Sequence, residues 1–190
     1  MSLIRPVGFA IVVALLSTAA SLTALSAPQQ GPPMPTPGPE HAFLKMDVGT
    51  WDAVAELNLG PGTPPMTMKG VEVNTIGCEG LCLTTVFKGE GPGGPFEGHG
   101  LVAWDPAKKK YVGSWTDSMS TGLATTEGTY DPATKKWTGW MEGPDMTGKV
   151  VKTRSVSEWT AAGGRVMTAY AAGPDGKEMQ VMKITYTRRK

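Results

Sequence analysis

The sequence predicts an all-β fold, an antiparallel up-and-down barrel of about ten strands preceded by a short helix. Apolar and polar residues alternate with period two through most of the chain after position 50. Turn signals rich in Gly, Pro and Asp separate these segments, and every connection is short, so neighbouring strands should pair antiparallel. Since no second layer of helices is predicted, closure is expected to cover the sheet edges. A β-sandwich is the competing architecture, but the steady hairpin spacing favours a barrel.

The helix is expected at residues 40–46, where Phe43, Leu44 and Met46 could cap one end of the barrel. The first strand is expected at 51–59. Its odd-numbered positions Trp51, Ala53, Ala55, Leu57 and Leu59 form an apolar face. The other strands are expected at 66–76, 81–88, 96–104, 111–119, 123–131, 137–142, 149–159, 165–171 and 177–188.

One internal repeat joins two of these hairpins. The segment DPAKKKYVG at Asp105 matches DPATKKWTG at Asp131, and each copy has an aromatic residue before and after its turn. Asp-Pro begins a type I turn, Lys keeps the tip in water, and the aromatic residues pair across the strands. These structural reasons are sufficient to explain the repeat.

The N-terminus has the three-part form of a secretory signal at residues 1–26. Arg5 precedes an apolar stretch, and small residues follow up to Ser26. The strongly apolar part is about ten residues, shorter than the ~20 that a membrane-spanning helix needs. We therefore expect cleavage and export to the periplasm or beyond, rather than an uncleaved anchor. Residues 27–39 form a Pro-rich spacer, and 40–190 form one barrel domain.

The charge pattern excludes some partners. The formal net charge is +1, and no Lys/Arg-rich stripe with interleaved aromatic residues indicates a nucleic-acid surface. The basic cluster Arg188-Arg189-Lys190 is explained as a solvated chain end. After cleavage of the signal, no membrane span is expected.

The two cysteines, Cys78 and Cys82, lie in the stretch IGCEGLCL. An exported chain allows a disulfide. Residues four apart in an extended strand are too distant to be joined, but a turn at Gly77 and Gly80 could bring them together. Both the free and the paired states remain open. A metal site at this pair is disfavoured because further ligands are missing nearby.

Two resemblances support the barrel. Gly49-Thr50-Trp51, which opens the first strand after a short helix, resembles the Gly-x-Trp signature of lipocalin-like (calycin) barrels. That resemblance implies that Trp51 closes the barrel base against an Arg of the last strand, and Arg188 is the candidate for stacking on its indole. Longer segments such as GPFEGHGLVAWDPAKKKYVGSWTDSM resemble the bacterial family named domain of unknown function 1579, which implies a barrel but no established activity.

Several side chains could contact a ligand. His99 lies between two glycines, which allow close backbone approach. Trp115, Asp117 and Met119 share one strand face. A three-residue turn at 120–122 would place Asp117 opposite Thr125 and Trp115 opposite Glu127. The sequence does not decide whether that face is interior, where the carboxylates would need partners, or exterior. Tyr186 is a further candidate.

We expect noncovalent binding of a small, largely apolar ligand inside the barrel. Eleven Met residues could line an adaptable cavity, although a loosely specified core explains them equally well. The ligand-binding candidates are His99, Trp115, Asp117, Met119, Glu127 and Tyr186. No cofactor or metal is predicted, and haem is a special case of the apolar-ligand hypothesis. Two competing hypotheses are a small-molecule enzyme that uses His99 with Asp117 or Glu127, and an interaction module with a packed barrel.

Overall fold

A computed structural model describes residues 31, 33–58, 60, 62–91, 93–145, 147–173 and 175–190. The expected export signal, the start of the Pro-rich spacer and Leu59 lie outside these residues. The chain divides into two units, Met1–Met34 and Pro35–Lys190, and the second contains all the helices and strands of the described residues.

The barrel unit begins with helix α1 (His41–Asp47). The strands and the short 3-10 helix η1 follow in the order β1 (Gly49–Leu57), β2 (Met66–Gly77), η1 (Cys78–Gly80), β3 (Cys82–Gly91), β4 (Gly94–Asp105), β5 (Lys110–Asp117), β6 (Ala124–Asp131), β7 (Lys136–Pro144), β8 (Val150–Trp159), β9 (Arg165–Ala172) and β10 (Glu178–Arg188). Within the described ranges, no helix has the length and apolar character needed to cross a membrane.

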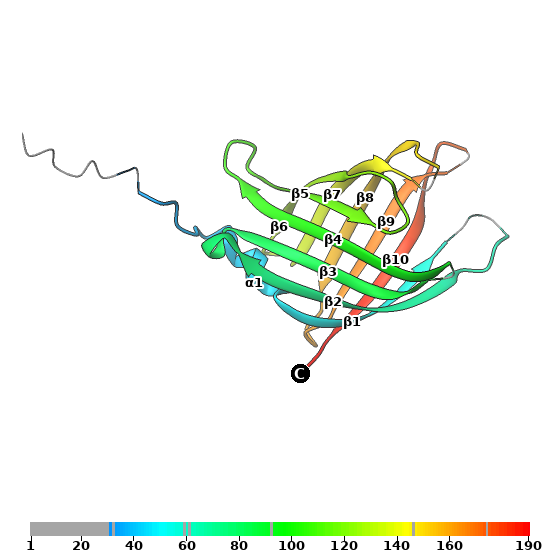
Figure 1. The fold of residues 1–190 in the computed structure, drawn as a ribbon, viewed down its shortest axis with the longest axis horizontal. Coiled ribbons are helices and arrows are strands. Elements are labelled where there is room, and N and C mark those ends of the chain that lie inside the picture. Colours follow the sequence, from blue (N-terminus) through cyan, green and yellow to red (C-terminus); the bar gives the residue numbers. More distant parts are fainter. Residues whose placement is uncertain are drawn as a thin grey trace, which may run out of the picture. The chain divides into compact units, whose positions relative to one another are not determined.

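The ten strands form one closed antiparallel barrel (Figure 1). Each strand pairs with its neighbours in sequence, and β1 closes the barrel by pairing with β10. The prediction of an up-and-down barrel is confirmed, and the sandwich is excluded. One irregularity was not predicted, a register shift in β10 between Gln180 and Met182.

Strand register shows which residues face the interior. On β1, Trp51, Ala53 and Ala55 are almost fully buried, whereas the residues between them are exposed. Residues directly opposite each other on paired strands share a face. Following the register from Trp51 around the barrel therefore separates inward-facing from outward-facing positions on all ten strands.

Inward-facing glycines make room for aromatic rings on neighbouring strands. A Cβ atom at Gly98 would overlap the Trp115 ring, and one at Gly100 would lie 3.1 Å from it. A Cβ at Gly70 would lie 2.5 Å from the Phe87 ring. Since real Cβ atoms rarely approach other atoms so closely, these positions favour glycine, which lets the rings lie flat against the barrel wall.

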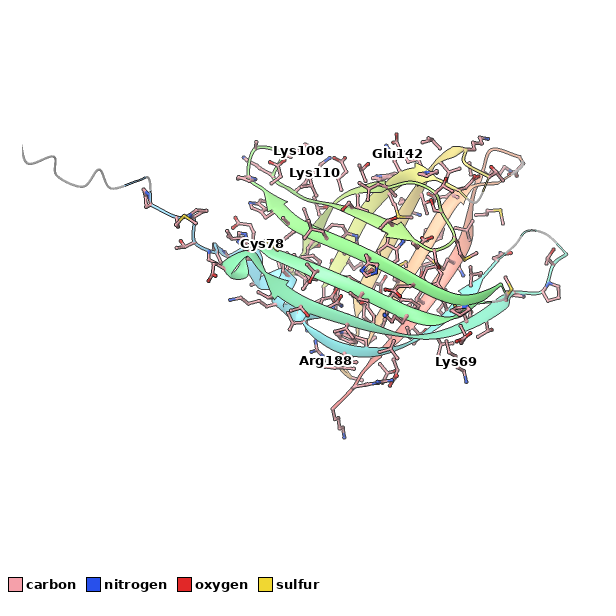
Figure 2. The ribbon with its side chains drawn as sticks, in the orientation of Figure 1. Lys69, Cys78, Lys108, Lys110, Glu142 and Arg188 are labelled. Atoms are coloured by element: carbon pink, nitrogen blue, oxygen red, sulfur yellow. A yellow bond between two sulfur atoms is a disulfide. The ribbon has the colours of Figure 1, made fainter. Side chains whose placement is uncertain are left out.

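The β2–β3 turn contains η1 and a disulfide. Cys78 and Cys82 are joined, with their Cα atoms 5.5 Å apart. Cys78, Glu79 and Gly80 all have positive φ angles, so the chain reverses tightly here and brings the two cysteines together. This turn lies at the α1 end of the barrel (Figure 2).

Candidate functional site

The floor of the barrel, at the α1 end, is a buried ionic cluster. The Arg165 guanidinium on β9 donates to Asp47 of α1 through Nη1 and to Glu72 of β2 through Nη2, the latter at 2.6 Å. The side chains of these three residues are 8%, 13% and 7% exposed, respectively. Trp159 Nε1 donates to Asp47 at 3.1 Å, and Asn74 Nδ2 donates to Glu72 at 2.7 Å. The cluster thus connects the helix with strands from both sides of the barrel.

Burial and charge set the protonation of this cluster. Burial raises the pKa of Asp47 above its usual value, and the nearby Arg165 guanidinium opposes that rise. Burial by itself would lower the pKa of Arg165, but the carboxylates of Asp47 and Glu72 outweigh it and raise that pKa above its ordinary value. Arg165 therefore stays charged, and it compensates the two acids.

Aromatic rings surround the floor. The Arg165 guanidinium lies 3.8 Å from the centroid of the Tyr186 ring and 5.5 Å from that of Trp51. Arg188 lies 4.2 Å from the Trp51 centroid, the stacking that the Gly-x-Trp resemblance implies. Arg188 also donates to the main-chain carbonyls of Val48 and Met46, each at 2.5 Å. It therefore joins the end of β10 to the end of α1 and to the residue that follows the helix.

The interior away from α1 is lined by apolar side chains. Met68 and Phe87 are buried there, whereas Phe96, Trp115, Met167 and Met182 pack against the core and stay partly exposed. We call these six residues the interior site. They come from β2, β3, β4, β5, β9 and β10, so the closed sheet brings distant parts of the sequence together.

Asp117 faces the interior and orients Trp115. Its Oδ2 accepts from Trp115 Nε1 at 2.8 Å, and its Oδ1 accepts from the backbone N–H of Met119 at 2.9 Å. The carboxylate therefore holds the indole against Gly98 and Gly100. Met119 itself lies beyond the end of β5 and is exposed, whereas Tyr186 is buried at the floor.

His99 and Glu127 are on the outer face, which corrects the expectation that they contact a ligand in the interior. His99 pairs in register with Thr116, and its side chain is 53% exposed, with Nε2 2.9 Å from Glu97. Glu127 pairs in register with Val112, and its carboxylate accepts from Lys110 at 2.9 Å.

These positions do not support the catalytic hypothesis. His99 and Asp117 lie on opposite faces of the sheet, so they cannot act on one substrate. His99 and Glu127 share the outer face, but their register partners on β5, Thr116 and Val112, are four residues apart. That separation is about 13 Å along a strand, too far for a direct hydrogen bond between the two side chains.

The predicted β5–β6 register was wrong. Trp115 lies opposite Ala124, not Glu127. The strand ends at Asp117, so the connection is longer than the predicted three-residue turn. This connection packs against Pro144, which a Cβ at Gly122 would approach to 2.5 Å. The resulting shift by an odd number of residues moves Glu127 to the other face of the sheet.

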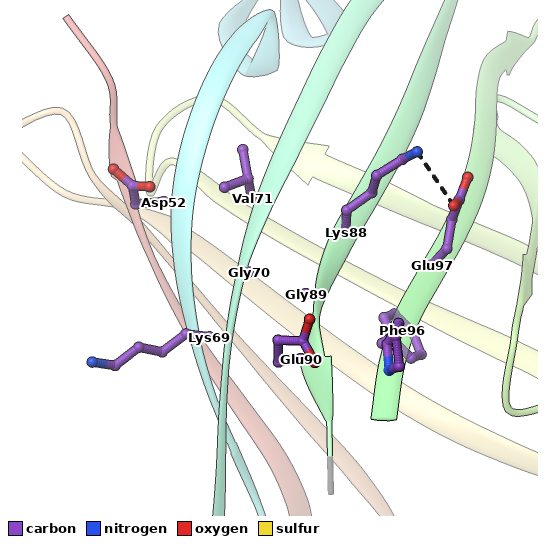
Figure 3. A pocket seen from close by; sticks show the side chains of 10 residues that line it. Asp52, Lys69, Gly70, Val71, Lys88, Gly89, Glu90, Phe96 and Glu97 are labelled. Atoms are coloured by element: carbon purple, nitrogen blue, oxygen red, sulfur yellow. Dashed lines mark ion pairs between the residues drawn. The ribbon is translucent and has the colours of Figure 1, made fainter. Parts of the chain in front are cut away.

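Two of the hollows in the described part of the chain lie outside the interior. One, of about 540 Å³, lies over the outer wall near β1–β4 and is surrounded by charged side chains that include Asp52, Lys88 and Glu97 (Figure 3). Lys88 pairs with Glu97 at 3.3 Å, and Asp52 pairs with Arg189 at 2.6 Å. Because these charges compensate one another, we assign no ligand to this hollow. The other lies beside α1.

The described part of the chain contains no group of side chains suited to bind a metal ion. No group of three or more His, Cys, Asp or Glu side chains that could hold a metal ion comes together there. Of the two histidines, His41 is buried in α1, where its Nδ1 accepts from the backbone N–H of Gly38 at 3.0 Å.

The ionic floor was not predicted from the sequence. The inward-facing residues of β2 include Gly70 and Glu72, whereas the apolar Val71 and Val73 face outward. Alternation of apolar residues therefore indicates the wrong face of this strand. The one sequence feature that pointed to the floor was Arg165, a charged residue at the start of a mostly apolar strand.

Comparison with known proteins supports the barrel. The model of the family described as "Protein of unknown function (DUF1579)" matches residues 36–188. Rv2717c from M. tuberculosis superposes with a TM-score of 0.62 at 12% identity, covering 80% of this chain and 99% of that protein. The S-type phycobiliprotein lyase CPES from Guillardia theta superposes with a TM-score of 0.53 at 12% identity, covering 81% and 99%. These similarities show the fold alone. No curated protein matches the chain.

We predict that Arg165→Met lowers the free energy of unfolding by about 3–5 kcal/mol, because it leaves two buried carboxylates without their cation. Arg154→Met is the matched control. Arg154 also lies over a tyrosine ring, 4.3 Å from the Tyr170 centroid, but it pairs with the exposed Glu178. Its loss should cost less than about 1 kcal/mol. Urea denaturation at neutral pH measures the free energy of unfolding of both variants. If the two variants lost equal amounts of stability, the buried position of Arg165 would have no special role.

A second prediction concerns alkaline stability. Burial, aided by Glu40, raises the pKa of Tyr111 from 10.0 to about 12. As pH rises through this range, the unfolded chain loses the proton before the folded chain does, so wild-type stability should fall between pH 10 and 12. Tyr111→Phe should lose less stability over this interval, although it starts about 1 kcal/mol lower without the hydrogen bond to Glu40. Denaturation curves at pH 9 to 12 give the free energy of unfolding of both proteins. If that free energy fell by the same amount in the wild type and in the Tyr111→Phe variant, the prediction would be refuted.

Proposed function

We propose that this chain, which belongs to the DUF1579 family, binds a small, largely apolar molecule noncovalently inside its barrel. The observation that carries the proposal is the mismatch between the width of the barrel and the size of the side chains that face inward. Ten strands enclose more space than eight, and eight are just enough for side chains to fill the interior.

Many inward-facing side chains on one part of the wall are small, although Met141 lies among them, in register with Thr126 and Thr153. The small residues are contributed by β5 to β9 and include Gly113, Thr126, Gly128, Gly139, Thr153, Ser155, Ser157 and Ala169. Some of these glycines accommodate aromatic rings, as Gly128 and Gly139 do for Trp137. Thr126, Thr153 and Ser155 stay partly exposed although they face inward, which supports a cavity beside them, whereas Ser157 and Ala169 are buried.

The chemistry of this interior favours an apolar ligand. The interior site combines methionines with aromatic rings, and Met side chains adapt to ligands of irregular shape. The polar groups of this region include Asp117 beside Trp115 and the hydroxyls of Thr126, Thr153 and Ser155 on β6 and β8. A ligand with an apolar body and one or two polar atoms would match this distribution.

We further propose that the protein acts after export, because residues 1–26 have the form of a secretory signal. Cleavage of the signal would leave the barrel with its Pro-rich leader, and the Cys78–Cys82 disulfide is compatible with an oxidising compartment. Mass measurement of the protein recovered from the exported fraction tests this proposal. A chain that begins near Ala27 supports it, and an intact Met1 in the cell interior would oppose it.

The direct test of binding is native mass spectrometry of protein purified without denaturation, followed by solvent extraction. A bound species of defined mass would support the proposal and reveal the class of ligand. An empty protein that also fails to bind an apolar dye would contradict it.

We predict that Ser155→Trp weakens binding of the neutral dye Nile red by about tenfold or more, or at least ~1.4 kcal/mol, because the indole fills the cavity. Val156→Trp is the control, since it adds the same side chain to the outer face of the same strand. Fluorescence titration at constant salt measures both affinities. Equal effects of the two variants would place the dye outside the barrel.

A further inference from the structure

We propose that the second hollow, beside helix α1, is a separate binding site for an aromatic molecule that carries both an ammonium and a carboxylate group. This pocket of about 540 Å³ lies between α1 and the β4–β5 and β6–β7 turns. The aromatic residues that line it are Phe43, Trp104, Tyr111 and Tyr130. None of them belongs to the interior site, so the inference is independent of the function proposed above.

The two copies of the repeat form two sides of this pocket. Each begins at an aspartate that accepts backbone N–H groups of its own turn, as Asp105 does from Ala107 and Lys108. Of the aromatic residues that flank the turns, Tyr111, Tyr130 and Trp137 contact Phe43 of α1, and Trp104 packs against Tyr111. The ring centroid of Phe43 lies 4.5 Å from that of Tyr130 and 4.7 Å from that of Tyr111.

The aromatic wall is only partly covered. Tyr111 is buried, and its hydroxyl donates to the main-chain carbonyl of Glu40 at 2.7 Å. Phe43, Trp104 and Tyr130 remain partly exposed on the pocket. Exposed ring faces and edges arranged around a hollow favour a flat aromatic ligand, because ring–ring contacts add to the gain from burial.

Two opposite charges stand on the pocket without a partner. Lys109 and Glu40 both line it, and neither forms an ion pair with any residue that the structure describes. The next lysine in each turn differs from Lys109 because it forms an ion pair: Lys110 pairs with Glu127, and Lys136 pairs with Glu158. A cation and an anion beside an aromatic wall complement a zwitterionic aromatic molecule better than a singly charged one.

The test uses three indoles of similar size: L-tryptophan, tryptamine and indole-3-propionate. They are titrated into the ¹⁵N-labelled protein, and the indole N–H signals of its tryptophans are followed by NMR. We expect the Trp104 signal to shift while that of Trp115, in the interior site, stays in place. Tryptophan should bind about threefold more tightly than either analogue, the size expected for one exposed charge pair.

Variants separate the two charges. Lys109→Ala should weaken tryptophan and indole-3-propionate about threefold and leave tryptamine unchanged, whereas Glu40→Gln should weaken tryptophan and tryptamine only. Lys135→Ala is the matched control, because Lys135 has the same position and the same positive φ in the other turn but does not line the pocket. Ala42→Phe places a ring in the pocket from an exposed helix position and should weaken all three ligands.

The inference would be overturned by a Trp104 signal that none of the indoles shifts, by equal affinity for all three indoles, or by equal effects of the Lys109 and Lys135 variants. A shift of Trp115 in place of Trp104 would also overturn it, while supporting the interior site. If the wild-type protein bound the indoles beside α1 but failed to bind Nile red, the result would contradict ligand binding inside the barrel and leave the inference about the α1 pocket intact.

Discussion

The buried guanidinium of Arg165 is the interaction on which the arrangement of the barrel depends. It holds Asp47 at the end of α1 and Glu72 on β2 from its own position on β9, so one side chain connects three elements that are distant in sequence. Neither carboxylate could remain buried and ionised in this environment without a cation. The helix is thereby attached to the barrel end by charge as well as by the packing of Leu44.

The ionic floor divides the barrel into two chemical regions. At the α1 end, Arg165 lies beside the rings of Trp51 and Tyr186, and aromatic rings from α1, β4, β5, β6, β7 and β8 pack against one another. Away from that end, the methionine, phenylalanine and tryptophan side chains of the interior site line the interior together with small residues of β6 to β8. The apolar lining is therefore separated from the charged groups, which are engaged with one another at the floor.

Glycine and aromatic residues act together in shaping both regions. The indole of Trp115 lies over two glycines and is held by Asp117, and that of Trp137 lies against Gly128 and Gly139. Each ring lies flat against the wall instead of extending across the barrel. The same device therefore fixes the position of both rings on the wall.

Local patterns in the sequence determined the ten strands, their short connections and the helix before them, because alternation and turn chemistry depend on neighbouring residues alone. They also indicated Trp51 and Arg188 as partners, through the Gly-x-Trp resemblance. The tertiary structure decided which face of each strand points inward. That choice depends on register, and the β5–β6 connection shifted the register by an odd number of residues, which placed Glu127 outside. The ionic floor likewise followed only from closure of the barrel, since Asp47, Glu72 and Arg165 are far apart in sequence and come together only when the strands on both sides meet.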